Sequence, residues 1–357
     1  MGIAKEYLKR CFELAAKGTG TVSPNPLVGV ILVKNGKVIV EGYHKKHGEA
    51  HAEVDALNNS TEDVEGSTLY CNLEPCCHTN KQTPPCVPLI IRNGIKKVVI
   101  STIDPNPDVN GEGVKQLQDA GIEVIIDVLK EDGKELNKFY FNYVKKKIPY
   151  VTLKIAQSKD GKITKSKNEQ TSLTGEESNR FVHQQRAAYD AVLVGANTVA
   201  VDDPQLNVRN AEGRNPKRII LDGKLSIDLN AVILSTEDIE NTWIITSKNS
   251  DKEKINNISE RGARVIQFKS DNEQIKLFDI LTKLGEEKIT SLFVEGGSNI
   301  FSQFIDGNYF DEIIILQAPI ILGKGVNGIP TSSLLHLKKI SSEKIGKDIK
   351  LVYKKSE

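Results

Sequence analysis

His51-Ala52-Glu53 is followed further along the chain by Pro75-Cys76 and then by Pro84-Pro85-Cys86. One imidazole and two thiolates offer a zinc ion three protein ligands and leave its fourth tetrahedral position for water. Glu53 stands two residues after the histidine, where its carboxylate can move protons to and from that water. This stretch predicts an open, catalytic zinc site that performs a hydrolysis, with Glu53 as the catalytic residue.

The spacing of these residues favours a catalytic over a structural zinc site. A structural site closes with four protein ligands, often as two close cysteine pairs, and a carboxylate beside two thiolates coordinates poorly. Zinc deaminases that act on nucleobases carry H-x-E followed by P-C-x-x-C. This chain has the first half and the Pro-Cys step, but Cys86 comes ten positions after Cys76, so the match is partial. The alternative is a core histidine with buried, inert cysteines.

The composition limits the other classes of function. The 357 residues suffice for two domains, since domains cluster near roughly 100–200 residues. Forty-eight Lys and Arg against 47 Asp and Glu leave a formal charge of +1, without the basic excess that drives binding to a phosphate backbone. No signal-peptide pattern opens the chain, and no apolar run approaches the roughly 20 residues of a membrane span. Four of the five cysteines fall between 71 and 86, which indicates a metal cluster. We therefore expect a cytoplasmic protein without nucleic-acid or membrane partners.

Hydrophobic periodicity predicts an α/β layer in the first part of the chain. Apolar residues at helical spacing indicate a helix over 1–17, and Asn35-Gly36 marks a hairpin turn between two strands, 27–33 and 37–43. Further expected elements are helices over 50–59, 85–93 and 113–120 and strands over 67–71, 97–101 and 123–127. The metal-binding segments thus stand at helix N-termini, where the helix dipole favours thiolates.

A lysine-rich stretch, 144–147, precedes Ile148-Pro149 and marks the expected domain boundary, because proline discourages a helix from continuing. We predict two domains, 1–147 and 148–357. The second domain also alternates between helices and strands. Its expected helices cover 176–188, 273–284 and 298–305, and its expected strands cover 150–157, 191–195, 218–221, 242–246, 264–268, 291–294 and 312–322.

The second domain contains one motif suited to anions. An apolar strand ends in Glu295-Gly296-Gly297 and passes to a helix with Ser298 as its expected N-cap. Side chains are absent where a phosphate must approach, so this turn predicts a backbone-lined anion pocket. An ordinary glycine turn is the alternative. No G-x-G-x-x-G follows a strand, so a nicotinamide cofactor must be held in another way.

Several motifs occur together in one order. Ser23-Pro24-Asn25-Pro26-Leu27-Val28-Gly29, His51-Ala52-Glu53, Leu73-Glu74-Pro75-Cys76 and Thr83-Pro84-Pro85-Cys86 together resemble the deaminase half of the bifunctional deaminase/reductase family of riboflavin biosynthesis. Residues 153–158 with Asp160-Gly161, 174–178, 202–206 and 295–297 resemble its reductase half. The resemblance covers nearly the whole chain.

The resemblance implies an α/β protein with an N-terminal cytidine-deaminase-like three-layer domain and a C-terminal dihydrofolate-reductase-like domain. Residues 1–147 would form a zinc-dependent pyrimidine deaminase domain, and residues 148–357 an NADPH-dependent reductase domain. The first would replace the exocyclic amine of 2,5-diamino-6-(5-phosphoribosylamino)pyrimidin-4-one by hydrolysis. The second would then reduce the ribosyl group of 5-amino-6-(5-phosphoribosylamino)uracil to ribityl with NADPH. The family also implies a dimer through the C-terminal domain, and Phe301, Phe304 and the expected strand 312–322 serve either the core or that interface.

The family's site residues carry over position by position. The resemblance implies zinc ligands at His51, Cys76 and Cys86, the catalytic carboxylate at Glu53, and a contact to the base from Asn25. It implies NADP contacts from Gln157, Ser172, Thr198, Asp202, Gly223, Gly297, Ser298, Asn299, Ile300, Phe301, Ser302 and Gln303. It implies reductase substrate contacts from Gln170, Arg186, Leu206, Arg209 and Glu295. A planar guanidinium can grip a phosphate with two hydrogen bonds, which gives the two arginines a chemical reason.

Three positions depart from the family pattern. The loop 77–82 is one residue longer than usual and brings a second thiol, Cys77, beside Cys76. Cys77 is the competing ligand, although the preceding proline favours Cys76. Ser172 stands where the family commonly has tryptophan, so this chain lacks a ring there to stack on the cofactor. Gln170 stands where the family commonly has serine, which changes the side chain expected to hydrogen-bond the substrate.

Two other classes of function stay open at the level of sequence. One is a zinc deaminase that acts on nucleic acid, with the C-terminal half as a binding module; the balanced charge argues against it. The other is an inactive, zinc-stabilised interaction protein, in which Cys77 or His78 fills the fourth metal position.

Overall fold

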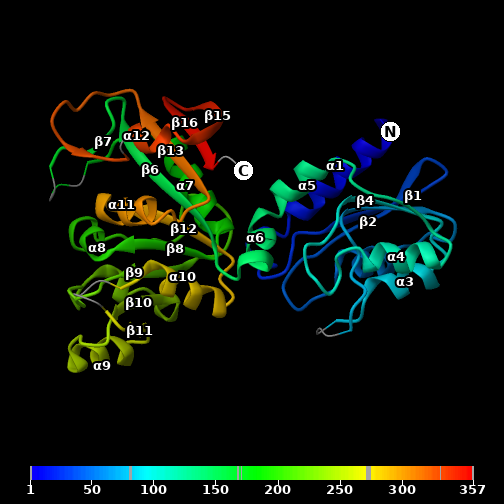
Figure 1. Cartoon of the computed structure of the whole chain (residues 1–357), viewed down its shortest axis with the longest axis horizontal. Coiled ribbons are helices and arrows are strands. Elements are labelled where there is room, and N and C mark those ends of the chain that lie inside the picture. The colour runs from blue at the N-terminus through cyan, green and yellow to red at the C-terminus, as the bar shows by residue number, and fades with distance from the viewer. Residues whose placement is uncertain are drawn as a thin grey trace. The chain divides into compact units, whose positions relative to one another are not determined.

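The computed structural model describes residues 2–79, 83–166, 169, 171–270, 275–329 and 331–355. The chain forms two compact units, 1–147 and 148–357 (Figure 1). The elements of the first unit are α1 (Gly2–Ala16), β1 (Gly29–Lys34), β2 (Lys37–Tyr43), α2 (Ala52–Asn59), β3 (Thr68–Leu73), α3 (Cys86–Arg92), β4 (Lys97–Thr102), α4 (Glu112–Asp119), β5 (Glu123–Ile125), α5 (Lys130–Leu136) and α6 (Lys138–Lys146).

The first unit is a three-layer α/β/α domain around a five-stranded sheet of order β2-β1-β3-β4-β5. Strand β1 is antiparallel to both β2 and β3, whereas β3, β4 and β5 are parallel. Successive residues of a strand face opposite sides of its sheet. Val30 and Leu69 accordingly pack under α2, α3 and α4, while Ile31 and Tyr70 pack against α1 on the other face.

The predicted hairpin turn is confirmed, because Asn35 and Gly36 both have positive φ, 52° and 77°, between β1 and β2.

Gly42 has a different role in the same hairpin. A Cβ atom at Gly42 would lie 2.5 Å from the backbone nitrogen of Ala56. Only glycine lets β2 approach α2 this closely, and that contact fixes the start of α2 next to the sheet.

The elements of the second unit are β6 (Tyr150–Ser158), β7 (Lys162–Thr164), α7 (Glu176–Ala188), β8 (Ala191–Gly195), α8 (Ala196–Asp202), β9 (Lys217–Leu221), η1 (Val232–Leu234), η2 (Ile239–Asn241), β10 (Thr242–Ser247), α9 (Lys252–Glu260), β11 (Arg264–Phe268), α10 (Leu277–Glu286), β12 (Ser291–Gly296), α11 (Ser298–Asp306), β13 (Glu312–Ala318), β14 (Val326–Asn327), α12 (Thr331–Leu334), β15 (Leu337–Ile345) and β16 (Asp348–Lys355).

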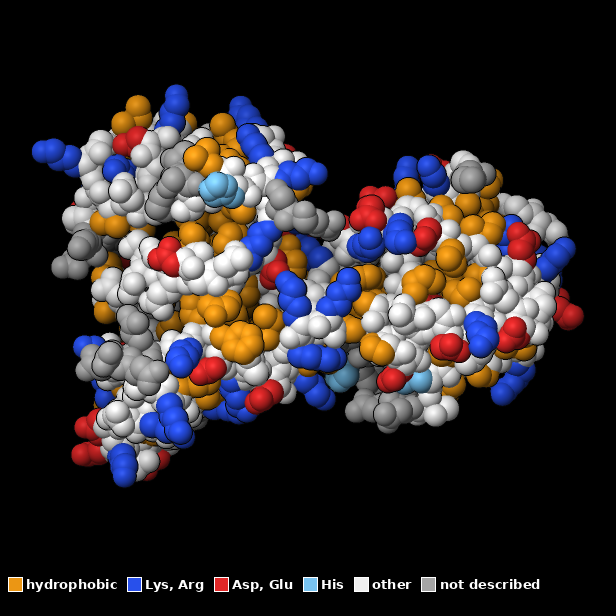
Figure 2. Space-filling model, in the orientation of Figure 1, with side chains coloured by type: hydrophobic (Ala, Val, Ile, Leu, Met, Phe, Trp, Pro, Cys, Tyr) orange, Lys and Arg blue, Asp and Glu red, His pale blue; other side chains and the backbone are white. Residues whose placement is uncertain are grey.

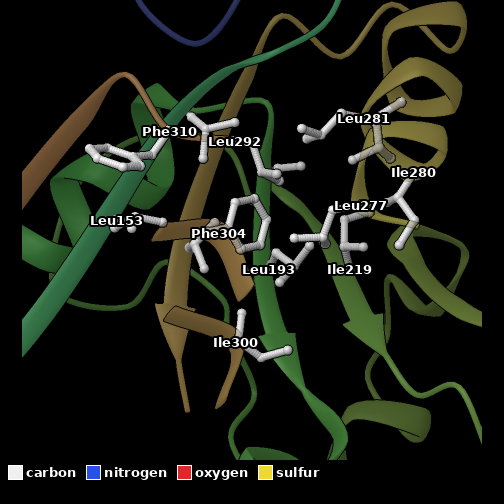
Figure 3. Packing of buried hydrophobic residues seen from close by; sticks show 14 of the residues in the cluster. Leu153, Leu193, Ile219, Leu277, Ile280, Leu281, Leu292, Ile300, Phe304 and Phe310 are labelled. Carbon is white, nitrogen blue, oxygen red and sulfur yellow. The ribbon is translucent and has the colours of Figure 1, made fainter. Parts of the chain in front are cut away.

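Nine strands form the main sheet of the second unit, in the order β11-β10-β9-β8-β12-β6-β13-β16-β15. The strands from β11 to β13 are parallel, and β16 and β15 add an antiparallel edge. Buried side chains of α10 and α11 cover one face of this sheet, with Phe304 and Leu281 packed over Leu193 and Leu292 (Figure 3). The carboxyl ends of the parallel strands therefore meet along one edge, where α/β proteins bind ligands.

Two predictions about this unit differ from the structure. The strand expected over 312–322 ends at Ala318, because Pro319 follows and has no N–H to donate to the ladder. Ser298 is not an N-cap: Gly297 occupies that position, no side chain caps the helix, and Ser298 is its first residue. Sequence patterns in this unit did not predict β7, α8, α9, β14, α12 or the hairpin of β15 and β16. Phe301 and Phe304, left open between core and interface, are 3% and 0% exposed and lie in the core.

In the first unit, Lys and Arg side chains alternate with Asp and Glu over the face that Figure 2 shows. That mixture agrees with the nearly neutral composition and forms no single basic band on that face. Among the described residues, no helix combines the length and the apolar character that crossing a lipid bilayer requires.

Candidate functional site

The first unit brings one histidine and two cysteines together. His51 is the N-cap of α2, Cys76 follows β3, and Cys86 opens α3. The Nδ1 atom of His51 lies 3.5 Å from the Sγ atom of Cys76 and 3.5 Å from that of Cys86. The carbonyl of Cys76 accepts hydrogen bonds from the backbone N–H of Cys86 (2.9 Å) and of Val87 (3.2 Å). These bonds tie the two cysteine segments together at the start of α3.

The three side chains fit a zinc ion. Their ligand atoms all lie within 4.8 Å of one another. In a tetrahedral site, bonds of about 2.0 Å to nitrogen and 2.3 Å to sulfur place those two atoms about 3.5–3.6 Å apart. The observed nitrogen–sulfur separations have this value. Cys77 lies outside the cluster, because its Sγ atom is 3.7 Å from the carbonyl oxygen of Asp108 and its side chain packs against the core. Within the described residues, the cluster thus offers three ligands and an open fourth position.

Thr83 orients the histidine of this cluster. Its Oγ1 atom lies 3.0 Å from Nε2 of His51, the ring nitrogen that faces away from the two thiols. When Nδ1 binds a metal, Nε2 carries the proton and donates it to the threonine hydroxyl. Such outer partners fix the ring orientation and the tautomer of a metal-binding histidine. In the sequence, Thr83 stands out only as part of the Thr-Pro-Pro-Cys motif.

We expect replacement of Thr83 by valine to weaken zinc binding by about 10- to 100-fold, the usual effect of losing an outer partner of a histidine ligand. Valine keeps the shape of threonine and removes its hydroxyl. Competition with a chromophoric chelator measures the affinity, and Thr83→Ser, which restores a hydroxyl, is the control. Equal zinc affinity of the valine variant and the parent protein would show that Thr83 has no such role.

Glu53 lies in the first turn of α2, two residues after His51, and its side chain is buried. Burial raises the pKa of its carboxyl, the Cys76 thiolate raises it further, and His51 opposes the shift. A carboxyl group that is not held ionised can both accept and return a proton. The structure thus places the buried carboxyl of Glu53, predicted from the sequence as the catalytic group, beside the three ligand side chains.

The loop that carries Asn25 is held by two amide side chains. Asn137 and Asn72 each donate a hydrogen bond to the carbonyl of Leu27, and Asn137 also accepts one from the Leu27 N–H. The side-chain amide of Asn25 donates to Nε2 of His44 (3.1 Å), and Nδ1 of His44 donates to the carbonyl of Ala50 (2.9 Å). Burial lowers the pKa of His44 and favours the neutral tautomer that this chain of bonds needs.

Glu74 and Asp104 follow the carboxyl ends of β3 and β4. The carboxylate of Glu74 accepts hydrogen bonds from the backbone N–H groups of Asp104, Gly111 and Val114. Burial raises the pKa of Asp104 to about 6, although the hydroxyl of Tyr140 donates to its carboxylate at 2.9 Å. Sequence reasoning missed Asp104 and His44, since neither stands in a metal-ligand motif.

A cavity of about 1110 Å³ lies along the carboxyl edge of the parallel strands in the second unit. It is lined by residues of β6 and β12 and by the residues that follow β8 and β9. Gly195 and Gly297 are the N-caps of α8 and α11, and neither helix has a side-chain cap. Gly297 has a φ of 82°, which favours glycine. The cavity wall thus presents backbone N–H groups at two helix starts, an arrangement that binds phosphates.

Most of the predicted reductase residues lie in this cavity or beside it. Those that line it are Ser172, Thr198, Asp202, Gly223, Gly297, Ser298, Asn299, Ile300, Phe301, Gln303 and Glu295. Gln157 and Ser302 are not among the described lining residues, and Ser302 is exposed on α11. Gln170 lies outside the residues that the structure describes.

A second, smaller cavity of about 420 Å³ adjoins the first through Asp202 and is lined by Arg186, Leu206 and Arg209. Leu206 has a φ of 53°, an uncommon value for a bulky residue and one typical of functional sites. The guanidinium of Arg209 is exposed and donates to the amide oxygens of Gln205 and Asn207. Its charge has no carboxylate partner among the described residues.

Arg186 is engaged differently from Arg209. Its Nε and Nη2 atoms bond the two carboxylate oxygens of Glu295 at 2.5 and 3.0 Å, and Lys154 lies 3.7 Å from the same carboxylate. Burial alone would raise the pKa of Glu295, but the two cations outweigh burial and hold it below its ordinary value. Burial lowers the pKa of Lys154. Two cations and one carboxylate thus share a half-buried cluster, which the sequence motifs did not reveal.

Comparisons with known proteins cover both units. The family model for the RibD C-terminal domain matches residues 149–351, and that for the cytidine and deoxycytidylate deaminase zinc-binding region matches residues 1–102. The riboflavin biosynthesis protein RibD of Aquifex aeolicus is 42% identical, with 99% of each chain covered. RibD of Escherichia coli is 33% identical, covering 91% of this chain and 90% of its own.

Solved structures of similar proteins match the chain over nearly its whole length. Acinetobacter baumannii RibD superposes with a TM-score of 0.88 at 32% identity, covering 99% of each chain. A Thermotoga maritima structure described as a diaminohydroxyphosphoribosylaminopyrimidine deaminase and 5-amino-6-(5-phosphoribosylamino)uracil reductase gives 0.87 at 38% identity, again with 99% of each chain covered. These matches do not favour a nucleic-acid deaminase. The chain belongs to the RibD family, the bifunctional proteins of riboflavin biosynthesis, with a zinc-binding deaminase domain followed by an NADPH-dependent reductase domain.

Proposed function

We propose that this chain performs two consecutive reactions on one phosphoribosylaminopyrimidine. The first unit hydrolyses the exocyclic amine of 2,5-diamino-6-(5-phosphoribosylamino)pyrimidin-4-one, and the second unit reduces the ribosyl group of the product to ribityl with NADPH. The description of the Thermotoga maritima relative, which is alike over nearly its whole length, supports this substrate pair.

The observation that carries the deaminase proposal is the buried Glu53 beside His51, Cys76 and Cys86. These three side chains would hold a zinc ion, which would supply a water of lowered pKa as the nucleophile. Glu53 would take up a proton from the attacking water and return protons to the ring nitrogen and to the leaving amine. Asn25, whose amide nitrogen is held by His44, would orient the base with its amide oxygen.

The reductase proposal is supported by the glycine-lined cavity and the arginines of its neighbour. NADPH supplies the hydride, so the chain's own residues mainly bind and orient the two partners. The helix starts at Gly195 and Gly297 suit the phosphates of a dinucleotide. Two N–H groups of Arg186 already donate to the carboxylate of Glu295. We therefore propose that Arg209 makes the main contact with the substrate phosphate.

We expect Arg209→Ala to raise KM for the phosphorylated reductase substrate by about 10- to 100-fold, with little change in KM for NADPH. A charge-assisted hydrogen bond contributes about 1.5–3 kcal/mol, which corresponds to this range. Steady-state kinetics with each substrate varied in turn gives both constants. The control is Arg180→Ala, which removes an exposed arginine that lines neither cavity. A dephosphorylated substrate that loses affinity equally on the mutation would rule out the phosphate contact.

The whole proposal is tested by supplying the diaminopyrimidine phosphate to the zinc-loaded protein with and without NADPH. We expect ammonia release in both cases and NADPH oxidation only after deamination. A product that stops at the deaminated ribosyl compound with NADPH present would remove the reductase half of the proposal. No ammonia release would remove the deaminase half.

We also propose that the chain is a cytoplasmic homodimer that associates through its second unit. All five cysteines are free thiols, which suits a reducing compartment. Ile340 and Ile349, on the antiparallel edge of the large sheet, are 48% and 41% exposed and offer apolar surface to a second copy. Light scattering coupled to size-exclusion chromatography measures the mass, and cell fractionation measures the location.

A further inference from the structure

The large cavity of the second unit has two distinguishable ends. Along the sheet, its wall passes from β6 through β12 and β8 to the end of β9. Strands lie about 4.8 Å apart, so these three intervals span about 14 Å. Near β6 and β12, Glu295 lines the cavity and bonds Arg186 of the adjoining substrate cavity. The nicotinamide ring of a bound dinucleotide, which is its reacting end, would therefore lie near β6 and β12. Its adenosine end would lie near the end of β9.

A tight turn forms the wall at the β9 end. Leu225 has a φ of 54°, and its N–H donates to the carbonyl of Asp222. The N–H of Asp222 donates to Ile245 and the carbonyl of Gly223 accepts from Ser247, so β10 holds this turn at both ends. The turn places Lys224 in the cavity lining with an exposed side chain.

The charges at this end distinguish between two kinds of adenosine ribose. Proteins that use NAD commonly bond the ribose 2′-hydroxyl with a carboxylate, whereas a cation accommodates the 2′-phosphate of NADP. The carboxylate of Asp222 is buried and already accepts hydrogen bonds from the Ser226 hydroxyl (3.0 Å) and the Ile227 N–H (2.7 Å). It is therefore turned inward to hold the turn.

Lys224 supplies the cation. Among the described residues that line the cavity, the cationic side chains are Lys154 and Lys224. Lys154 is half-buried at the opposite end and faces Glu295. We propose that Lys224 binds the 2′-phosphate of the cofactor and thereby selects NADPH over NADH. This inference rests on the proposed use of a nicotinamide cofactor in this cavity and assigns its selectivity to one residue of the β9 turn.

Binding of cofactor fragments tests the assignment without requiring turnover. Calorimetry compares 2′,5′-ADP with 5′-ADP on the full-length protein. We expect Lys224→Ala to weaken 2′,5′-ADP by about tenfold or more, the effect of losing a charged hydrogen bond, and to leave 5′-ADP within about twofold. Lys224→Arg should retain most of the preference. The control is Lys252→Ala, which removes an exposed lysine outside the cavity.

Kinetics with NADPH and NADH separates this inference from the proposed function. We expect the parent protein to prefer NADPH and Lys224→Ala to lose that preference through a higher KM for NADPH alone. An alanine variant that keeps the parent's ratio of NADPH to NADH and its preference for 2′,5′-ADP would overturn the role of Lys224 while the reductase function stands. A parent protein that binds neither fragment and oxidises neither cofactor would instead overturn the function on which the inference rests.

Discussion

Replacing Glu53 by glutamine is expected to lower the rate of deamination by about 100- to 10,000-fold, the range that general acid–base catalysis contributes. Glutamine has nearly the same shape and cannot carry the proton between water and the leaving amine. The buried position of Glu53 beside the three ligand side chains is the reason to expect a large effect. Ammonia release under saturating substrate measures the rate.

Two further measurements make this result specific. Zinc content should stay at the parent level, because Glu53 is outside the ligand cluster. NADPH oxidation with the already deaminated substrate should also be unchanged, because every described residue that lines the large cavity belongs to the second unit. Glu62→Gln, which alters an exposed glutamate paired with Lys37, is the matched control and should deaminate normally. Deamination by the Glu53 variant at the parent rate would refute the mechanism.

The second large effect is expected from the cysteine pair at 76 and 77. Cys76→Ser should lower zinc affinity by more than 100-fold, beyond the about 10- to 100-fold that losing an outer partner costs, and deamination should fall with it. Cys77→Ser should keep both zinc and activity, because its sulfur lies by the carbonyl of Asp108 and not in the cluster. Metal analysis after dialysis against a chelator measures the difference.

This pair of variants also tests the alternative of a closed, structural site. Four protein ligands would make the protein sensitive to both substitutions and leave no position for water. Zinc loss in the Cys77 variant together with zinc retention in the Cys76 variant would reverse the assignment. The absorption spectrum of a cobalt-substituted sample reports the number of thiolate ligands independently.

Local sequence patterns sufficed for the fold class and the family. Residue type and spacing within about ten residues predict the Asn35-Gly36 turn and the helices that begin next to His51 and at Cys86. They also predict the alternation of helices and strands in the second unit. The joint order of the motifs led to the same family that the comparisons show. The roles of the individual site residues stay predictions.

Patterns failed where an element depends on a partner strand. The hairpin of β15 and β16 was missed because its first strand is largely exposed and carries little apolar alternation. It forms because β13 leaves an edge on which β16 pairs from Glu312 to Gln317. The end of β13 at Ala318 likewise depends on its neighbours and on Pro319.

The sequence by itself determined which chemical groups this protein has: a zinc-type ligand set with a nearby carboxylate, a glycine turn for an anion, and two arginines. Only the tertiary structure decided how those groups are used. Arg186 and Glu295 are 109 positions apart, yet their ion pair leaves Arg209 as the exposed cation among the described residues of the smaller cavity. Lys224 gains its proposed role from a turn held by β10. The physical reason is that burial and pairing set the charge and reach of a side chain, and both depend on residues that are distant in sequence.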